Sequence, residues 1–274
     1  MTSATPEENE PSAPEPPRTA TSTTPGNTPA SATVPTPIDG SITPLIRLVT
    51  LAGRVFARVV TRVRVEGELD AIPREGPLII AANHASNLDA VVIGSWLIGK
   101  IGRRFQWLGK KELFDWPIVG WVASRGGVHP VDRSTADVEA FRLAMRILEE
   151  GQVLFVFPEG TRSPDGALQP ARDGVAVLAL RSGAPIVPVA IAGSSAVWPR
   201  SRRLPKPGGQ VTVRVGRPFR IADLVPPDTD RRPAKGLATE VIMRRIAKLL
   251  PPAQQGAYAA TGAAEASLPA ASQE

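Results

Sequence analysis

The stretch from Leu78 to Asp89 reads LIIAANHASNLD and changes character twice. Leu78–Ala82 is a continuous apolar run, which is typical of a strand buried on both faces of a parallel sheet. Polar residues then form a short turn, and a longer apolar segment over Leu88–Gly99 predicts a helix. A buried strand that leads through a polar turn into a helix is a common unit of α/β domains.

The same alternation continues through most of the chain. Further strands are predicted at Arg62–Glu66, Phe105–Leu108, Val128–Val131, Val153–Phe157, Ile186–Ala192 and Val211–Val215. Further helices are predicted at Trp116–Ala123, Thr135–Glu149, Gly174–Arg181 and Ala238–Leu249. This succession predicts an α/β fold with a mostly parallel sheet of about seven strands flanked by helices. Functional residues in such folds gather at the carboxyl ends of the strands.

A basic amphipathic helix is predicted ahead of this sheet, over Ile42–Val63. Apolar side chains at helical spacing form one face, which consists of Leu45, Val49, Ala52, Phe56, Val59 and Val63. The opposite face carries Arg47, Arg54, Arg58 and Arg62. Such a helix suits attachment in the plane of an anionic membrane. It equally suits packing on its own domain with the arginines in water, and the two interpretations are compatible.

Composition bounds the folded part of the chain. Residues 1–40 are dominated by Pro, Thr, Ser, Ala and Glu and are expected to be disordered, and residues 251–274 to be flexible. These two segments carry seven acidic side chains and one basic one, so residues 41–250 have a net charge of +12 against +6 for the whole chain. A basic domain suggests an anionic partner: nucleic acid, an anionic membrane or a phosphorylated small molecule.

Other residue counts exclude several kinds of site. The chain has no cysteine, which excludes disulfides, thiol nucleophiles and cysteine-based metal sites, and with only two histidines no metal site is expected. No run of about 18 uninterrupted apolar residues predicts a membrane-spanning helix. The aromatic fraction is only 5%, and no nucleic-acid-binding motif is visible, so DNA or RNA is a weak candidate for the partner.

His84 and Asp89 lie in the turn that follows the strand Leu78–Ala82. An Asp five residues after a His, at the start of a helix, can fold back and accept a hydrogen bond from one ring nitrogen. That fixes the tautomer and leaves the other nitrogen free as a base. The arrangement is that of a Ser-His-Asp triad whose serine is replaced by a hydroxyl of the substrate. Taken alone, the spacing also fits an ordinary turn histidine and a helix-start carboxylate.

Two more strand ends carry residues suited to an anion. Residues 157–163 read FPEGTRS, in which Gly160 allows a ligand close to the backbone and Arg162 offers a planar fork to a phosphate. Residues 127–133 read GVHPVDR, and Arg133 is a second possible phosphate ligand. His129 falls inside this strand and is more typical of a packed histidine than of a catalyst. Each segment by itself is also compatible with a plain polar turn.

In order and content these segments resemble the glycerolipid acyltransferases of the lysophosphatidic acid acyltransferase type. The resemblance covers about residues 60–220 and rests on four blocks of the family pattern. The matching residues are Asn83, His84 and Asp89 in the first block, 127–133 in the second, 157–163 in the third and 187–189 in the fourth. The family often has Phe-Lys-x-Gly after the third block, whereas residues 171–174 read ARDG, without the aromatic side chain.

The resemblance implies transfer of a fatty acyl group from a thioester to a lipid hydroxyl. His84 would be the base and Asp89 its partner; Arg133, Gly160, Thr161 and Arg162 would bind the acceptor's phosphate, with Glu159 at its polyol part. The acceptor would be a lysophospholipid, by default 1-acylglycerol-3-phosphate. Acyl-CoA or acyl-carrier protein would be the co-substrate, with no cofactor. The acyl chain would lie along the helix after Asp89, against Val91, Ile93, Trp96 and Leu97.

The same residues also allow other interpretations. The acceptor could be another lysolipid or a glycolipid. A serine hydrolase would need a nucleophilic serine, and no Gly-x-Ser-x-Gly sequence is present. A non-catalytic protein that binds anionic lipids would use the arginine-rich helix and the basic domain. Both as an acyltransferase and as a non-catalytic lipid-binding protein, the chain is expected to be a peripheral protein held by anionic lipids at the cytoplasmic face of the cell membrane.

Overall fold

A computed structural model describes residues 2, 37–131, 137–225 and 229–259. In these ranges seven strands form one sheet. They are β1 (Arg62–Gly67), β2 (Leu78–Ala82), β3 (Phe105–Lys110), β4 (Val128–Val131), β5 (Val153–Val156), β6 (Ile186–Ala192) and β7 (Gln210–Val215). Their order in the sheet is β1-β7-β6-β2-β5-β3-β4. Every neighbouring pair is parallel except β6 and β7. The predicted α/β fold with a mostly parallel sheet is therefore confirmed.

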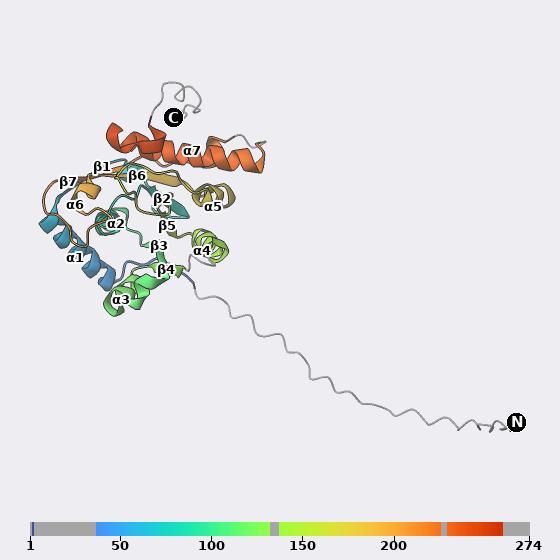
Figure 1. Cartoon of the computed structure of the whole chain (residues 1–274), viewed down its shortest axis with the longest axis horizontal. Helices are drawn as coiled ribbons and strands as arrows, with labels where there is room; N and C mark the ends of the chain where they lie inside the picture. The colour runs from blue at the N-terminus through green and yellow to red at the C-terminus, as the bar shows by residue number, and fades with distance from the viewer. Residues whose placement is uncertain (1, 3–36, 132–136, 226–228, 260–274) are drawn as a thin grey trace. The chain divides into compact units, whose positions relative to one another are not determined.

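Helices cover both faces of this sheet (Figure 1). They are α1 (Pro44–Val60), α2 (Asp89–Ile101), α3 (Pro117–Arg125), α4 (Asp137–Glu149), α5 (Gly174–Ser182), α6 (Ser194–Val197) and α7 (Arg231–Leu249). Alternate residues of β2 show how the two layers arise. Ile79 and Ala81 point into the core formed with α4, α5 and α7. Leu78, Ile80 and Ala82 point into the core formed with α1 and α2. This explains why β2 is apolar throughout.

Two helix predictions are corrected at their ends. Helix α7 begins at Arg231, seven residues before the predicted start at Ala238. Pro233 lies in its first turn, where the missing N–H removes no helical hydrogen bond, so the proline does not prevent the helix. Helix α1 ends at Val60 and Val63 belongs to β1, since Thr61 is extended. The predicted start of α4 at Thr135 lies outside the described residues.

The surface of α1 differs from its prediction. Its most buried side chains are Ile46, Ala57 and Val60, and it packs so closely on α2 that a Cβ at Gly53 would lie 2.2 Å from Ser95 Oγ. Arg54 Nε donates to the carbonyl of Ser95, and Arg58 lies over the ring of Trp96, so these two arginines reach over α2.

The exposed side of α1 is apolar instead. Large apolar side chains with helical spacing point away from the domain: Leu48, Leu51, Val55 and Val59. This exposed apolar stripe was not predicted, and the predicted arginines Arg47 and Arg58 are exposed beside it. No helix in the described parts of the chain is long and apolar enough to cross a bilayer.

The described residues of both predicted tails make contacts with the domain. Ile38 donates its N–H to the carboxylate of Glu150, and Asp39 pairs with Arg104, so the chain packs on the domain before residue 41. At the other end, Ala171 donates its N–H to the hydroxyl of Tyr258 at 3.0 Å. Two short 3-10 turns, Pro252–Gln254 and Gly256–Tyr258, lie in this part of the segment that was predicted to be flexible.

Candidate active site

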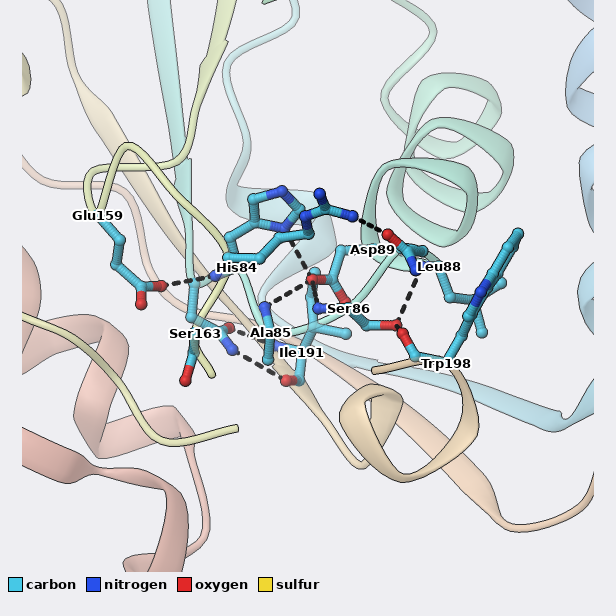
Figure 2. A network of polar contacts seen from close by, with 12 residues as sticks. His84, Ala85, Ser86, Leu88, Asp89, Glu159, Ser163, Ile191 and Trp198 are labelled. Carbon is cyan, nitrogen blue, oxygen red and sulfur yellow. Dashed lines mark hydrogen bonds and ion pairs between the residues drawn. The ribbon is translucent and has the colours of Figure 1, made fainter. Parts of the chain in front are cut away.

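The polar loops after β2, β5 and β6 meet at one edge of the sheet. These strands are neighbours, with β2 in the middle, so the carboxyl ends of all three lie side by side. Asn83, directly after β2, fixes this edge with a side chain that both donates to and accepts from the backbone of Ile191 in β6. The segment that follows Asn83 is thereby held over the end of the sheet (Figure 2).

His84 and Asp89 are brought together in this segment. The Nδ1 atom of His84 lies 2.9 Å from Oδ2 of Asp89, which is fully buried. The same oxygen accepts the backbone N–H groups of Ala85 and Ser86, each at 2.7 Å (Figure 2). Three donors on one oxygen lock the turn and fix the orientation of the imidazole.

The imidazole of His84 is packed on one face and open at its far nitrogen. Its ring stacks on Phe157 with centroids 3.9 Å apart and an angle of 11° between the planes. The side chain is 20% exposed, and Nε2 has no hydrogen-bond partner among the described residues. With Nδ1 on a carboxylate, Nε2 is the nitrogen available to a substrate.

Glu159 lies beneath the turn and is only 4% exposed. One carboxylate oxygen accepts the backbone N–H of His84 at 2.6 Å, and the other accepts that of Gln169 at 3.0 Å. Burial raises the pKa of Glu159 to about 7, and the carboxylates of Asp89 and Asp165 act in the same direction against the two N–H donors. Glu159 thus joins the His84 turn to the loop that follows β5.

The rest of that loop shapes the rim of the site. Gly160 has a φ of +68°, and a Cβ there would lie 3.2 Å from Nε of Arg172, so a side chain would press on this arginine. Thr161 is exposed and Arg162 is half-buried. The guanidinium of Arg162 donates to the side-chain oxygen of Asn87. The structure thus brings His84, Asp89 and the loop with Glu159, Gly160, Thr161 and Arg162 to one place.

The second block is placed farther along the sheet. Strand β4 is the edge strand, three positions from β2, which is roughly 14 Å at the usual strand spacing. His129 Nε2 pairs with the side-chain oxygen of Gln106, and burial lowers its pKa, with Arg104 and Arg146 adding to the effect. His129 is a packed histidine, as expected. Arg133 lies outside the described residues.

Two residues of the site were not singled out from the sequence. Asn87 holds Arg162, and its amide nitrogen also donates to the carbonyls of Pro199 and Arg202. Ser163 donates its N–H to the carbonyl of His84 at 2.7 Å. Both are polar residues inside the matched segments, close in sequence to His84 and Arg162, and this position is the signal that could have found them.

An apolar cavity of about 410 Å³ begins one residue beyond Asp89. Its lining comes from α1, α2 and the end of α3, and includes Val49, Phe56, Ala90, Val91, Gly94 and Ile98. The volume falls in the range typical of small-ligand sites. Of the residues predicted to line an acyl groove, Val91 does so, but Ile93, Trp96 and Leu97 belong to the buried core between α2 and the sheet.

Comparison with known proteins agrees with this geometry. Residues 62–192 match the family model described as Acyltransferase. This matched segment, just under half of the chain, is similar to the acyltransferase family. The matched range extends from β1 to the end of β6 and contains the His84–Asp89 pair and the whole loop from Phe157 to Ser163.

Solved and curated relatives are similar over much of the acyltransferase domain. The 1-acyl-sn-glycerophosphate acyltransferase of Thermotoga maritima has a TM-score of 0.61 and 27% identity, covering 74% of this chain and 79% of that one. A 1-acyl-sn-glycerol-3-phosphate acyltransferase of Bacillus subtilis is 28% identical over 179 residues, which are 65% of this chain and 83% of the relative.

Two other relatives are matched over a smaller share of their length. The chloroplastic 1-acyl-sn-glycerol-3-phosphate acyltransferase of Brassica napus is 31% identical over 52% of this chain and 41% of its own, so the chain spans less than half of this plant relative. A lyso-ornithine lipid O-acyltransferase of Pseudomonas aeruginosa is 32% identical over 55% of each chain. The acceptors named for these relatives differ, while the acyl-transfer reaction is common to them.

Proposed function

We propose that this acyltransferase moves a fatty acyl group from a thioester to the free hydroxyl of a lysophospholipid. The observation that carries the proposal is the ring of His84, which is held by Asp89 at Nδ1 and free at Nε2. No serine or cysteine nucleophile is required, because the acceptor itself brings the attacking hydroxyl.

The reaction balances with these two side chains. Nε2 of His84 takes the proton of the acceptor hydroxyl as its oxygen attacks the thioester carbonyl. The resulting imidazolium lies against the buried carboxylate of Asp89, which stabilises the positive charge. The tetrahedral intermediate then expels the thiolate, which receives the proton from His84. An ester and a free thiol are the products, and His84 returns to its starting state.

The acceptor's phosphate is proposed to bind at the loop after β5. Arg162 and the backbone around Gly160 and Thr161 supply charge and hydrogen bonds, and Arg133 adds a second cation. The position of Glu159 beneath the turn favours a supporting contribution, through the backbone of His84, beside any contact with the acceptor's polyol. The names of the relatives support 1-acylglycerol-3-phosphate as acceptor and phosphatidic acid as product.

A second acceptor class is proposed as the alternative. The relative from Pseudomonas aeruginosa is named for a lyso-ornithine lipid, which lacks the glycerol phosphate headgroup. The replacement of the family's usual aromatic residue by Ala171 falls beside the loop that is proposed to bind the acceptor. The acceptor therefore has to be identified by measurement with both classes of lysolipid.

The donor's acyl chain is proposed to lie in the apolar cavity between α1 and α2. The cavity begins next to Asp89, so a chain inside it would present its thioester carbonyl near His84. The exposed apolar stripe of α1 is proposed to lie in the plane of the membrane, as for other amphipathic surface helices. The enzyme is proposed to be a peripheral protein, at the cytoplasmic face of the cell membrane.

The proposal is tested with purified wild-type and His84→Ala protein. Lysophosphatidate, lysophosphatidylglycerol and lyso-ornithine lipid are each offered with acyl-CoA and with acyl-carrier protein. Transfer to one acceptor by the wild-type, reduced at least about 1,000-fold in the variant, is the expected result. Equal rates for the two proteins would refute the base assignment. Rapid release of free fatty acid without an acceptor would instead indicate a hydrolase.

A further inference from the structure

The segment from Trp198 to Gly209 joins α6 to β7 and lies beyond the range matched by the family model. It reads WPRSRRLPKPGG and carries four exposed cationic side chains: Arg200, Arg202, Arg203 and Lys206. In the described parts of the chain, none of these four side chains has a hydrogen bond or an ion pair. No Asp or Glu occurs between Asp173 and Asp223, so this basic loop has no acidic neighbour in sequence.

The tip of the basic loop is apolar and exposed. Leu204 is 75% exposed and stands among the cations. A single exposed leucine is ordinary, but the loop that carries this one is attached at its base to the end of α1. Gly208 donates its N–H to the carbonyl of Val60 at 2.8 Å, and Val59 beside it is also 75% exposed. The base of the loop thus meets the end of α1 that carries the last residue of the exposed apolar stripe.

We propose that the basic loop is a second membrane contact, which binds anionic phospholipid headgroups while Leu204 enters the interface. The inference rests on the proposed function, in which the acceptor is itself a membrane lipid. Cations around an apolar tip match the layering of a bilayer surface, where phosphates lie above the acyl chains. Each Arg or Lys near an anionic membrane adds to its binding, so the loop would add to the attraction of α1.

The basic loop is also fixed to the turn that carries His84. The carbonyl of Trp198 accepts the hydroxyl of Ser86 at 2.7 Å and the N–H of Asn87 at 3.1 Å. The amide nitrogen of Asn87 donates further along the loop, to the carbonyls of Pro199 and Arg202 (Figure 2 shows the bond from Ser86 to Trp198). A membrane-bound loop would therefore hold the entrance of the site toward the bilayer from which the acceptor comes.

The proposal is tested by vesicle sedimentation with the full chain. The loop variant Arg200→Gln/Arg202→Gln/Arg203→Gln is compared with the control Arg217→Gln/Arg232→Gln/Lys248→Gln, which removes the same charge from exposed side chains elsewhere. Vesicles are made of phosphatidylcholine with and without phosphatidylglycerol. Both proteins also carry His84→Ala, so that no acyl transfer changes the lipids during the measurement.

The loop variant is expected to bind anionic vesicles about 100-fold more weakly than the unsubstituted loop. The control is expected to lose about threefold or less, because its charges lie outside the contact and are screened. In the native loop, Leu204→Ser is expected to weaken binding to both kinds of vesicle about tenfold. Equal losses in the loop variant and the control would overturn the proposal.

The loop could instead bind the phosphates of the thioester donor. A separate kinetic measurement distinguishes this ligand from phospholipid headgroups. The three loop substitutions are made with His84 in place, and KM is measured for acyl-CoA and for an acyl-pantetheine without phosphates. A rise in KM for acyl-CoA alone, with vesicle binding unchanged, would replace the membrane assignment. Absence of acyl transfer by the wild-type protein would refute the proposed function and leave the vesicle result intact.

Discussion

Asp89 holds His84 through a single oxygen, Oδ2, and this oxygen also accepts the N–H groups of the two residues after the histidine. Its other oxygen, Oδ1, is buried and has no hydrogen-bond partner among the described residues. All of the hydrogen bonds that fix the turn therefore go to Oδ2. The negative charge of the carboxylate faces the imidazole of His84.

Replacing Asp89 with Asn separates the effect of the carboxylate's negative charge from that of the hydrogen bonds that hold the turn. The amide oxygen can occupy the place of Oδ2 and keep all three hydrogen bonds, so the fold should survive with a loss of roughly 1–3 kcal/mol from the buried amide nitrogen. The imidazolium would lose its counter-charge, and kcat should fall about 100-fold or more. Thermal unfolding and steady-state kinetics of the same preparation check both. A kcat within about threefold of wild-type would contradict the assigned pair.

The buried carboxyl of Glu159 predicts a pH-dependent stability. Its pKa is raised from 4.5 to about 7, so the folded protein keeps this proton over a range in which the unfolded chain has released it. The free energy of unfolding should therefore fall as pH rises from about 4.5 to 7, by roughly 3 kcal/mol from this group, and then level off. Urea unfolding of wild-type and Glu159→Gln protein across this range tests it. The variant should lack this component, although it should be less stable throughout, because one N–H loses its acceptor.

Asn87 is predicted to position Arg162. In Asn87→Ala the guanidinium loses its side-chain partner, and KM for the acceptor should rise about tenfold. KM for the donor should change little, because Asn87 does not line the apolar cavity. Asn87→Asp keeps an acceptor for Arg162 and serves as the matched control, with a smaller rise expected. An unchanged acceptor KM in Asn87→Ala would show that Arg162 needs no such support.

Gly94 offers a way to shorten the apolar cavity. A Cβ at this position would meet only Trp107 and Ile98, at 3.8 and 3.9 Å, so Gly94→Ala should fold and act normally. Gly94→Leu should fill part of the cavity and lower kcat/KM for long acyl-CoA about fourfold for each methylene that no longer fits. A series of acyl-CoA lengths measures the effect. An identical chain-length profile in wild-type and Gly94→Leu would place the acyl chain elsewhere.

Much of the fold could be predicted because its strands are buried on both sides. Leu78–Ala82 and Ile186–Ala192 were predicted with the observed bounds, since their apolar runs end abruptly in polar or turn residues. The pair His84 and Asp89 could be predicted because both members lie in one short turn.

What failed depended on contacts between distant segments. Helix α1 is apolar on two sides, and only its packing on α2 decides that Ile46 and Ala57 face inward while Leu48 and Val55 face outward. The partnership of Asn87 and Arg162 spans 75 residues and needs β2 and β5 to be neighbours. The periodicity of apolar residues along one segment shows neither which side of a helix packs on another helix nor which strands are neighbours in the sheet.

Strand β7 runs antiparallel to β6, and this direction determines where the connection between the two strands lies. In a parallel pair the chain must return across the whole sheet, but β7 starts at the edge where β6 ends. The connection between them therefore stays at one end of the sheet. Only its first part, with Val197, enters the core, and adding residues to the exposed part costs little closure entropy. Between Arg202, which Asn87 holds, and Lys206, its length and charge can be redesigned while the catalytic turn keeps its hydrogen bonds, which makes this tip the place to redirect the enzyme to another lipid surface.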